Sequence, residues 1–282
     1  MIGLPLLRSP QQLRSRVKSW RAFGETVALV MVHGAPHEGH ASLVRAAQKE
    51  ADRVLVTLVP PGDAPPADES PDAPSPHEPA VAALMDEVGA DALYAPSRQV
   101  FRPEGFATRV HVAGLADVLD GEETSAALDA FAADMIRLFA QTRPDVAVFC
   151  ELAWQRRLIA ERVAKDFDLC PRVAVAETER DDEGAPVCLA APAARPPAAR
   201  LWRELRRAAA AIAAGAEAES TLDAAADALA DAGAEVEYLD LRDAATLDEL
   251  DALGRGRDAR IFGAIAMDGA RLSDTVAVGA GS

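Results

Sequence analysis

The chain has 282 residues, of which 50% are hydrophobic and 5% aromatic, and its formal net charge at pH 7 is −16. This length is sufficient for one large α/β domain and a smaller one, each with a buried core. The negative charge argues against nucleic acid as a partner, because sequence-independent binding to a phosphate backbone needs clustered Lys and Arg. No run approaches the roughly 18 apolar residues of a membrane span, and no signal peptide is evident. We therefore expect a cytoplasmic protein with no membrane partner.

Apolar runs alternate with helical periodicity through the first part of the chain. The sequence predicts strands at about 26–32, 53–59, 91–94 and 145–150, and helices at about 41–50, 78–88, 124–141 and 154–167. This alternation is typical of a Rossmann-like α/β fold, a doubly wound parallel sheet with helices on both faces. In such a sheet, ligands bind at the carboxyl ends of the strands.

The C-terminal part predicts a separate, smaller α+β unit. Helices are expected at about 198–214 and 220–232, and short strands near 235–240, 259–265 and 275–278. We therefore predict a Rossmann-like domain at 1–176, to which the turn described below assigns nucleotide binding, and a small C-terminal α+β domain at 177–282.

Residues 60–79 are too rich in proline and acidic residues to form a helix or strand. This loop either closes over a site as a lid or is an inert connection, and the sequence does not distinguish the two.

The first predicted strand runs into a turn and a helix that carry several histidines. Gly34 and Pro36 mark the turn, and His37, Gly39 and His40 lie where the helix begins. Unpaired N–H groups and partial positive charge make a helix N-terminus a natural phosphate site. Two imidazoles there could hold a triphosphate, with Gly39 letting it approach the backbone. The alternative is that these histidines are only a cap or surface residues.

A metal site is a weaker alternative at the same turn. His33, His37 and His40 lie within eight residues, and imidazole is a common zinc ligand. Their spacing across a turn matches no specific zinc pattern, so we predict no metal site in the protein itself. His77 and His111 are predicted to be surface residues without a role. The three cysteines show neither zinc-site spacing nor an even disulfide framework, which favours a reducing compartment.

At this turn the chain resembles the pantothenate synthetase (pantoate–β-alanine ligase) family of the nucleotidylyltransferase superfamily. The family pattern Pro-Thr-Met-Gly-Ala-Leu-His-x-Gly-His-x-x-Leu-Val is matched by residues 31–44. The likeness continues at 51–58, 91–96, 103–108 and 236–239.

The resemblance implies a two-step, AMP-forming reaction. A carboxylic acid attacks the α-phosphorus of ATP to give an acyl-adenylate and pyrophosphate, and an amine then attacks the activated carbonyl. His37 and His40 are expected to act on the phosphates as catalytic residues, with Mg²⁺ entering on ATP. The nucleotide site would also include Gly34, Gly39 and Glu151, and the acid pocket His33, Gln155 and Arg156. The resemblance also implies a homodimer.

The chain departs from the family in several segments. At 61–65 the element Asn-Pro-x-Gln-Phe is replaced, so that Ala64 stands where an amide would bind pantoate. At 124–128 the Arg-Pro-Gly-His-Phe loop is replaced, and no serine of the Met-Ser-Ser-Arg-Asn loop remains at 184–195. In Gly-Glu-Lys-Asp-x-Gln-Gln, Glu151 and Gln155 are kept, while the other four specified positions became Cys150, Leu152, Ala153 and Arg156.

Three hypotheses follow. The chain is a pantothenate synthetase-like ligase whose acid substrate is not pantoate, or an ordinary pantoate–β-alanine ligase, or a degenerate family member that acts as a binding or regulatory subunit. In the ordinary ligase, the missing groups would be supplied by neighbours, for which the candidates are His33, Arg98, Arg102, Arg156 and Arg195.

Overall fold

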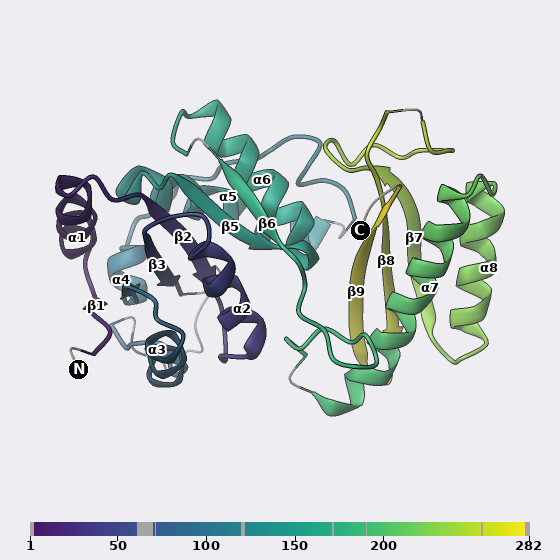
Figure 1. Cartoon of the computed structure of the whole chain (residues 1–282), viewed down its shortest axis with the longest axis horizontal. Helices are drawn as coiled ribbons and strands as arrows, with labels where there is room; N and C mark the ends of the chain where they lie inside the picture. The colour runs from purple at the N-terminus through teal and green to yellow at the C-terminus, as the bar shows by residue number, and fades with distance from the viewer. Residues whose placement is uncertain are drawn as a thin grey trace. The chain divides into compact units, whose positions relative to one another are not determined.

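The computed structural model describes residues 3–60, 70, 72–119, 122–170, 172–189, 191–254 and 256–279. The chain divides into two compact units, Met1–Glu177 and Thr178–Ser282. Figure 1 labels the helices and strands of both.

The first unit is built on a parallel sheet. Its six strands have the order β1-β4-β3-β2-β5-β6, and all pairs are parallel. Their bounds are β1 Leu6–Leu7, β2 Val27–Val32, β3 Arg53–Leu58, β4 Ala92–Tyr94, β5 Val146–Cys150 and β6 Val173–Ala176. The order reverses between β2 and β5, which is where an open α/β sheet forms its ligand-binding crevice.

Helices cover both faces of this sheet. They are α1 Pro10–Ala22, α2 Glu38–Ala47, α3 Glu78–Glu87, α4 Arg98–Phe101, α5 Glu122–Thr142 and α6 Trp154–Asp166, with the short 3₁₀ helix η1 at Glu151–Ala153. The helices α2 and α3 contact each other, and α5 contacts both α1 and α6. Figure 1 shows α2 and α3 on one side of the sheet and α5 and α6 on the other.

The central strands are uninterrupted apolar runs because both of their faces are covered. Along β2, five of the six residues are buried, and β3 is buried from Val54 to Leu58. The two strands pair from Val27 opposite Arg53 to Val32 opposite Leu58. This register brings the carboxyl ends of both strands to the same edge.

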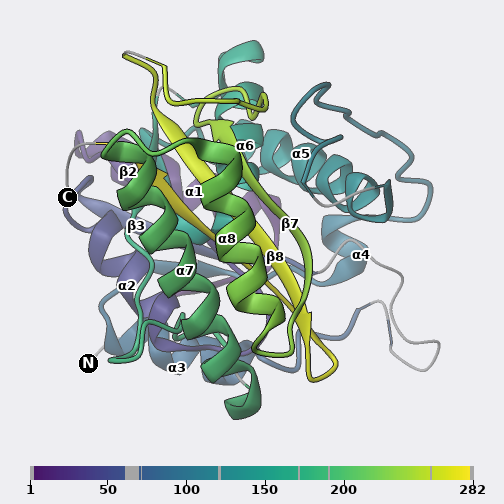
Figure 2. The ribbon, with the colours of Figure 1, turned by 90° about the vertical axis from the view of Figure 1, so that its right-hand side faces the viewer.

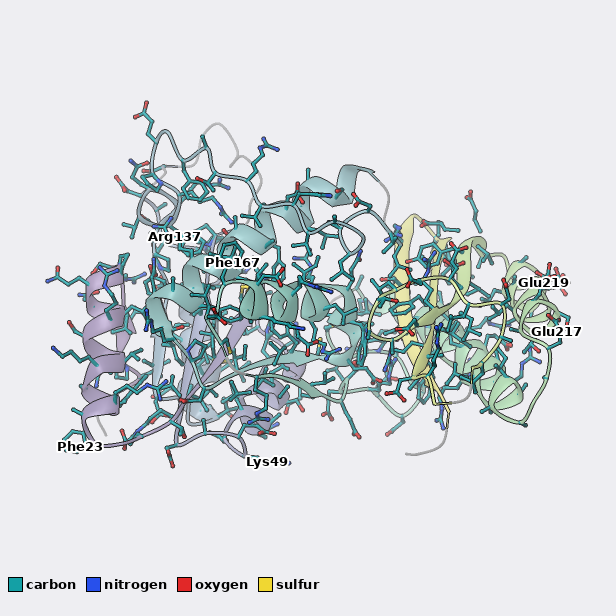
Figure 3. The ribbon with its side chains drawn as sticks, turned by 90° about the horizontal axis from the view of Figure 1, so that it is seen from above. Phe23, Lys49, Arg137, Phe167, Glu217 and Glu219 are labelled. Carbon is teal, nitrogen blue, oxygen red and sulfur yellow. The ribbon has the colours of Figure 1, made fainter. Side chains whose placement is uncertain are left out.

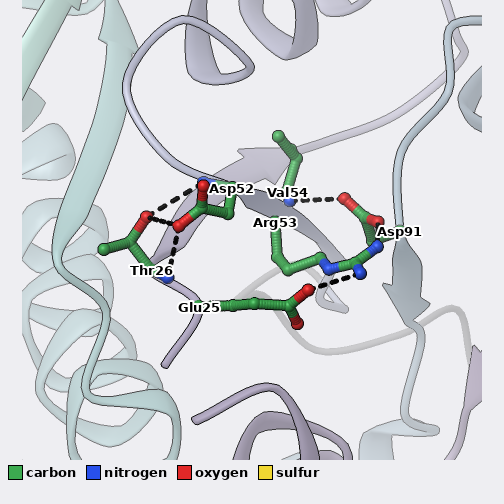
Figure 4. Close-up of polar contacts among 6 residues, drawn as sticks. All are labelled: Glu25, Thr26, Asp52, Arg53, Val54 and Asp91. Carbon is green, nitrogen blue, oxygen red and sulfur yellow. Dashed lines mark hydrogen bonds and ion pairs between the residues drawn. The ribbon is translucent and has the colours of Figure 1, made fainter. Parts of the chain in front are cut away.

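At the amino ends of the strands, opposite the carboxyl ends, charged side chains connect neighbouring strands by hydrogen bonds and ion pairs. Arg53 donates at 2.6 Å to both Glu25 and Asp91, and the second Asp91 oxygen accepts the Val54 N–H at 2.8 Å. Next to them, Asp52 accepts from the hydroxyl and backbone N–H of Thr26 (Figure 4). These bonds satisfy most of the polar groups at the strand starts, although the Nε of Arg53 is buried without a partner among the described residues.

The second unit is a three-stranded antiparallel sheet with two long helices. The strands are β7 Glu235–Asp243, β8 Ala259–Met267 and β9 Ala270–Val278, and the helices are α7 Arg195–Ala213 and α8 Ala218–Ala230, preceded by the 3₁₀ helix η2 at Pro192–Ala194. Figure 2 shows α7 and α8 lying across one face of this sheet. The N-cap of α8 is Glu217, which Figure 3 labels together with Glu219. Its carboxylate accepts the N–H groups of Glu219 and Ser220 at 3.0 and 2.7 Å.

The predicted α/β fold with a doubly wound parallel sheet and a smaller α+β part is confirmed. Besides the 3₁₀ helix η1, four elements of the first unit were not predicted. The strands β1 and β6 have only two and four residues, and α4 has four. The helix α1 buries only Leu13, Val17 and Trp20, so its apolar stripe is narrow. The strand β9 is longer than predicted and begins at Ala270.

Part of the predicted 60–79 loop, residues 61–69 and 71, lies outside the described residues, and so does Ala64. Within the described residues, no helix is long and apolar enough to span a bilayer.

Candidate active site

The site lies at the carboxyl edge of the parallel sheet, where four neighbouring strands end. The strand order β4-β3-β2-β5 places side by side Tyr94, Pro60, His33 and Cys150, which end or follow these strands. These four positions are far apart in the sequence. The sheet topology alone therefore gathers them at the edge where an open α/β sheet binds its ligand.

The turn between β2 and α2 contains the predicted histidines. Gly34 has a φ of +64°, a left-handed conformation that glycine adopts without strain. His37 is the N-cap of α2 in an extended conformation, and its side chain makes no capping bond. The helix then begins at Glu38, with Gly39 in its first turn. The N–H groups of this first turn point out of the helix end, where an anion would meet them.

The imidazoles of His37 and His40 stack on each other. Their ring centroids are 3.7 Å apart, and the planes differ by 24°. The Nδ1 atoms of both rings are buried and have no hydrogen-bond partner among the described residues. Buried polar atoms without partners are rare in native proteins and often indicate a site that a ligand or water completes.

All three histidines of the turn are shifted towards the neutral form. The pKa of His40 is lowered to about 3, mainly by burial and in smaller part by His37 and His33. Burial also lowers the pKa of His37. The pKa of His33 is lowered to about 4, mainly by burial and in smaller part by the positive charges of Arg156 and then Arg102. At neutral pH these imidazoles are uncharged, and each keeps one N–H to donate.

Two arginines therefore act on the same histidine from different parts of the fold. Arg102 follows α4 and donates to the backbone oxygen of Pro60 at 2.9 Å, and it forms an ion pair with Asp134 of α5. Arg156 lies in the first turn of α6, with its guanidinium 5.2 Å from the ring centroid of Phe131. Both guanidinium charges act on His33, and the charge of Arg102 is balanced by its ion pair with Asp134.

Asp134 is a residue of this region that the sequence reasoning missed. Its carboxyl is buried beside Arg102, and burial raises its pKa to about 6 although Arg102 and Arg137 act in the opposite direction. A charged residue among the apolar positions of α5 was the signal available in the sequence. The guanidinium of Arg137, one turn further along α5, donates to the backbone oxygens of Val100 and Phe101 (Figure 3).

Gln155 lies in the first turn of α6, next to Arg156. Its side chain is buried, and both amide hydrogens are donated to backbone oxygens, of Leu115 at 2.8 Å and of Val118 at 2.7 Å. The amide nitrogen is thus committed to the protein, and only the side-chain oxygen remains for a ligand. Glu151 begins η1 directly after β5. Their roles in binding acid and nucleotide stay predictions.

Cys150 ends β5 beside these residues. Burial raises the pKa of its thiol, as does the negative charge of Glu151, while nearby backbone N–H groups lower it to a lesser extent. A thiol with a raised pKa is mostly protonated at neutral pH, so it is a poor nucleophile.

A cavity of about 610 Å³ lies at the other edge of the sheet. It is lined by residues that precede β5 and β6, including Arg143, Asp145 and Arg172. This is the amino end of the strands, and the histidine turn does not border it. We place the candidate site at the carboxyl edge, because the stacked imidazoles with their two unpartnered nitrogens and the lowered histidine pKa values are there.

Comparison with known proteins decides the family. The family model of the pantoate–beta-alanine ligases matches residues 5–277. The chain belongs to the pantoate–beta-alanine ligase family. It is 37% identical to a pantothenate synthetase of Cereibacter sphaeroides, over 97% of this chain and 99% of that one. It is 38% identical to that of Novosphingobium aromaticivorans, over 95% and 96% of the two chains.

Solved structures of this family share the fold. The pantothenate synthetase of Thermus thermophilus superimposes with a TM-score of 0.84 at 27% identity, covering 98% of this chain and 100% of that one. The pantoate–beta-alanine ligase of Francisella tularensis, solved with a form of ATP and β-alanine, gives a TM-score of 0.68 at 20% identity, covering 98% of each chain. The predicted family is thus confirmed.

Proposed function

We propose that the chain is an ATP-dependent ligase of the pantoate–β-alanine kind, which activates a carboxylic acid as an acyl-adenylate and couples it to an amine. Family membership over nearly the whole chain supports this class of reaction. The observation that carries the nucleotide site is the stacked pair of His37 and His40, each with a buried, unpartnered Nδ1, at the start of α2.

In the first step, a carboxylate oxygen of the acid bonds to the α-phosphorus of ATP, and the bond from that phosphorus to the β-phosphate bridging oxygen breaks. Pyrophosphate leaves. The imidazoles of His37 and His40 and the first N–H groups of α2 donate hydrogen bonds to the phosphate oxygens, and these bonds strengthen as charge develops. Since a bound triphosphate favours imidazolium, the two rings take up protons as the nucleotide binds.

In the second step, the amine nitrogen bonds to the activated carbonyl carbon, loses a proton, and AMP leaves. Gly34 and Gly39 allow the nucleotide to approach the backbone of the turn, and Glu151 lies at the adjacent strand end. Mg²⁺ is expected to enter with ATP and to neutralise phosphate charge. Within the described part of the chain, no group of three His, Cys, Asp or Glu side chains could hold a metal by itself.

The acid is held near His33, with Arg156 and Gln155 at the start of α6. Pantoate, with β-alanine as the amine, is the first pair to test, because the relatives carry the name pantothenate synthetase. In this case Arg102 and Arg156 supply the charge that the replaced family residues no longer provide.

A second candidate is a ligase whose acid is not pantoate. It is favoured by Arg156, which replaces a neutral glutamine of the family pattern and whose positive charge acts on His33. Such a charge suits an acid with a further anionic group, since each charge-assisted hydrogen bond contributes about 1.5–3 kcal/mol.

Nucleotide binding can be tested by thermal unfolding with and without millimolar MgATP. We expect ATP to raise the melting temperature of the wild-type chain. The double variant His37→Ala and His40→Ala should lose that shift, while His77→Ala, a change at an exposed histidine, should keep it. If the wild-type chain shows no shift, both ligase hypotheses fail, and a binding or regulatory subunit becomes the better explanation.

Pyrophosphate release then distinguishes the two ligase hypotheses, which differ in their acid substrate. Release that requires both pantoate and β-alanine supports the ordinary ligase, whereas release only with another acid from a panel of hydroxy acids, dicarboxylates and amino acids supports the second candidate. We also propose that the protein is cytoplasmic and forms a homodimer. Sedimentation of the purified chain tests the homodimer.

A further inference from the structure

The segment 111–118, which follows α4, is attached to two helices by polar contacts. The imidazole of His111 lies between two carboxylates. Its Nδ1 is 3.0 Å from Asp129 of α5, and its Nε2 is 3.2 Å from Asp117 of the same segment. Asp117 also accepts the backbone N–H of Gly114 at 3.3 Å. The histidine thus joins the segment to α5.

The chemistry of these contacts requires a proton. Ionised carboxylates only accept hydrogen bonds, and a neutral imidazole has one N–H and one lone pair. A neutral ring can therefore satisfy one of the two carboxylates, while its other nitrogen faces an acceptor. Only imidazolium donates to both Asp117 and Asp129.

The charges around the ring favour that protonated form. The hydrogen bond to Asp129 is the main cause that raises the pKa of His111 above its usual 6.5, and Asp117 raises it further. Desolvation is the second-largest effect and lowers the pKa, but the two carboxylates together outweigh it at a side chain that is 46% exposed. Among the described residues, no other charged group contributes to this shift.

The other side of the segment is attached to α6. Gln155 donates to the backbone oxygens of Leu115 and Val118, so the segment is held at two points between the two helices. Gln155 directly precedes Arg156, whose positive charge acts on His33. The segment therefore connects Asp129 of α5, through His111, to the start of the helix that carries the acid-pocket arginine.

We propose that His111 is a positioning residue, a proton-dependent clamp that fixes segment 111–118 between α5 and the start of α6. When His111 loses its proton, the ring loses its positive charge and can donate to only one of the two carboxylates, so the attraction between the segment and Asp129 of α5 weakens. This inference goes beyond the proposed function, since the clamp needs no substrate to operate.

Two variants distinguish the effect of the proton on His111 from the effect of its side-chain contacts. His111→Arg keeps a planar cation with donors on both sides, and its charge does not change in the accessible pH range. His111→Gln removes the charge at every pH. Because the side chain is about half exposed, both variants are expected to fold. His77→Gln is the control for changing an exposed histidine elsewhere.

The test is amide hydrogen exchange of the full chain without ligand, followed by mass spectrometry on peptides that cover 108–119. For the wild type, we expect exchange, corrected for intrinsic rates, to be about two- to fivefold faster at about pH 8.5 than at about pH 6, since exposed ion pairs contribute modestly. His111→Arg should stay protected at both pH values, and His111→Gln should exchange fast at both. Equal wild-type protection at the two pH values, or a pH dependence that persists in His111→Gln, overturns the proposal.

A second measurement checks the proton itself. A histidine NMR titration, with the His111 signal assigned by its loss in His111→Gln, should give a pKa above 6.5 that falls in Asp129→Asn. A pKa of 6.5 or lower overturns the clamp. Neither measurement uses ATP or an acid substrate. The clamp proposal can therefore fail while the ligase proposal stands, and the ligase proposal can fail while the clamp proposal stands.

Discussion

Gln155 and Gln48 each donate side-chain amide hydrogens to two backbone carbonyl oxygens, but only Gln155 is buried. Gln155 bonds to Leu115 and Val118, whereas Gln48 bonds to Val88 and Gly89 at 2.9 and 3.1 Å from an exposed position. The same contact is thus present in two environments. Water can replace the amide of Gln48 but not that of Gln155.

We therefore predict different effects of one substitution at the two positions. Gln155→Glu should lower the free energy of unfolding by about 2 kcal/mol or more, because a carboxylate cannot donate and two buried carbonyls lose their partner. Gln48→Glu should change it by less than about 1 kcal/mol. Urea unfolding followed by circular dichroism measures both. Equal losses at the two positions would show that burial is not the cause.

Gly184 of the second unit is predicted to tolerate no side chain. Its φ is +97°, and a Cβ atom there would lie 2.1 Å from the ring of Trp202. The ring cannot move freely, because its faces carry the guanidinium groups of Arg180 and Arg206 at 5.0 and 4.9 Å from the centroid. Backbone strain and overpacking together should make Gly184→Ala destabilising by about 2–5 kcal/mol.

Gly215 offers a matched control for that substitution. It has the same φ of +97°, but a Cβ atom there would meet nothing within 4 Å. Gly215→Ala should therefore show only the strain, about 1–2 kcal/mol. Thermal unfolding of both variants measures the difference. If Gly184→Ala is no worse than Gly215→Ala, the packing of Trp202 does not restrict this position.

The sequence was sufficient where local patterns determine structure. The apolar run of β2, the turn at Gly34 and the helix that follows are each encoded by adjacent residues, so the fold class and the place of His37 and His40 could be predicted. Short elements with few buried residues, such as β6, have too weak a pattern to be seen.

Long-range polar contacts could not be predicted in the same way. The pairing of Arg102 with Asp134 joins α5 to the end of α4, and only the packed sheet brings them together. The burial of Gln155 against the 111–118 segment likewise depends on tertiary structure. For this reason the sequence indicated which residue types belong to the site and left their partners undetermined.

His40 should make the stability of the first unit sensitive to acid. Its folded-state pKa is about 3, below the 6.5 of an unfolded histidine, so the unfolded chain binds more protons between these values. Stability is therefore lost as the pH falls from about 6.5 towards about 3, at up to about 1.4 kcal/mol per pH unit from this group.

A variant without the imidazole should show a shallower slope. His40→Gln should reduce the pH dependence of the urea midpoint between about pH 6.5 and 4.5, whereas His77→Gln should leave the wild-type slope. The measurement is urea unfolding at several pH values. An unchanged slope in His40→Gln would mean that the imidazole is not desolvated in the folded chain.

The charge of Arg156 should affect the acid substrate and not the nucleotide. Both acid hypotheses place this guanidinium against the substrate, whose carboxylate it would bind next to His33. Arg156→Gln should then lower kcat/KM for the acid about ten- to hundredfold, the value of a charge-assisted hydrogen bond of about 1.5–3 kcal/mol. The KM for ATP should change by less than about twofold, because Arg156 is proposed to contact the acid and not the nucleotide.

Arg157→Gln is the matched control for Arg156→Gln, because Arg157 pairs with Glu161 and stacks on Trp154. Steady-state pyrophosphate release with each substrate varied in turn gives these constants. A loss shared equally by acid and ATP would indicate a structural role for Arg156, and a gain with pantoate would show that the arginine opposes that acid and favours another.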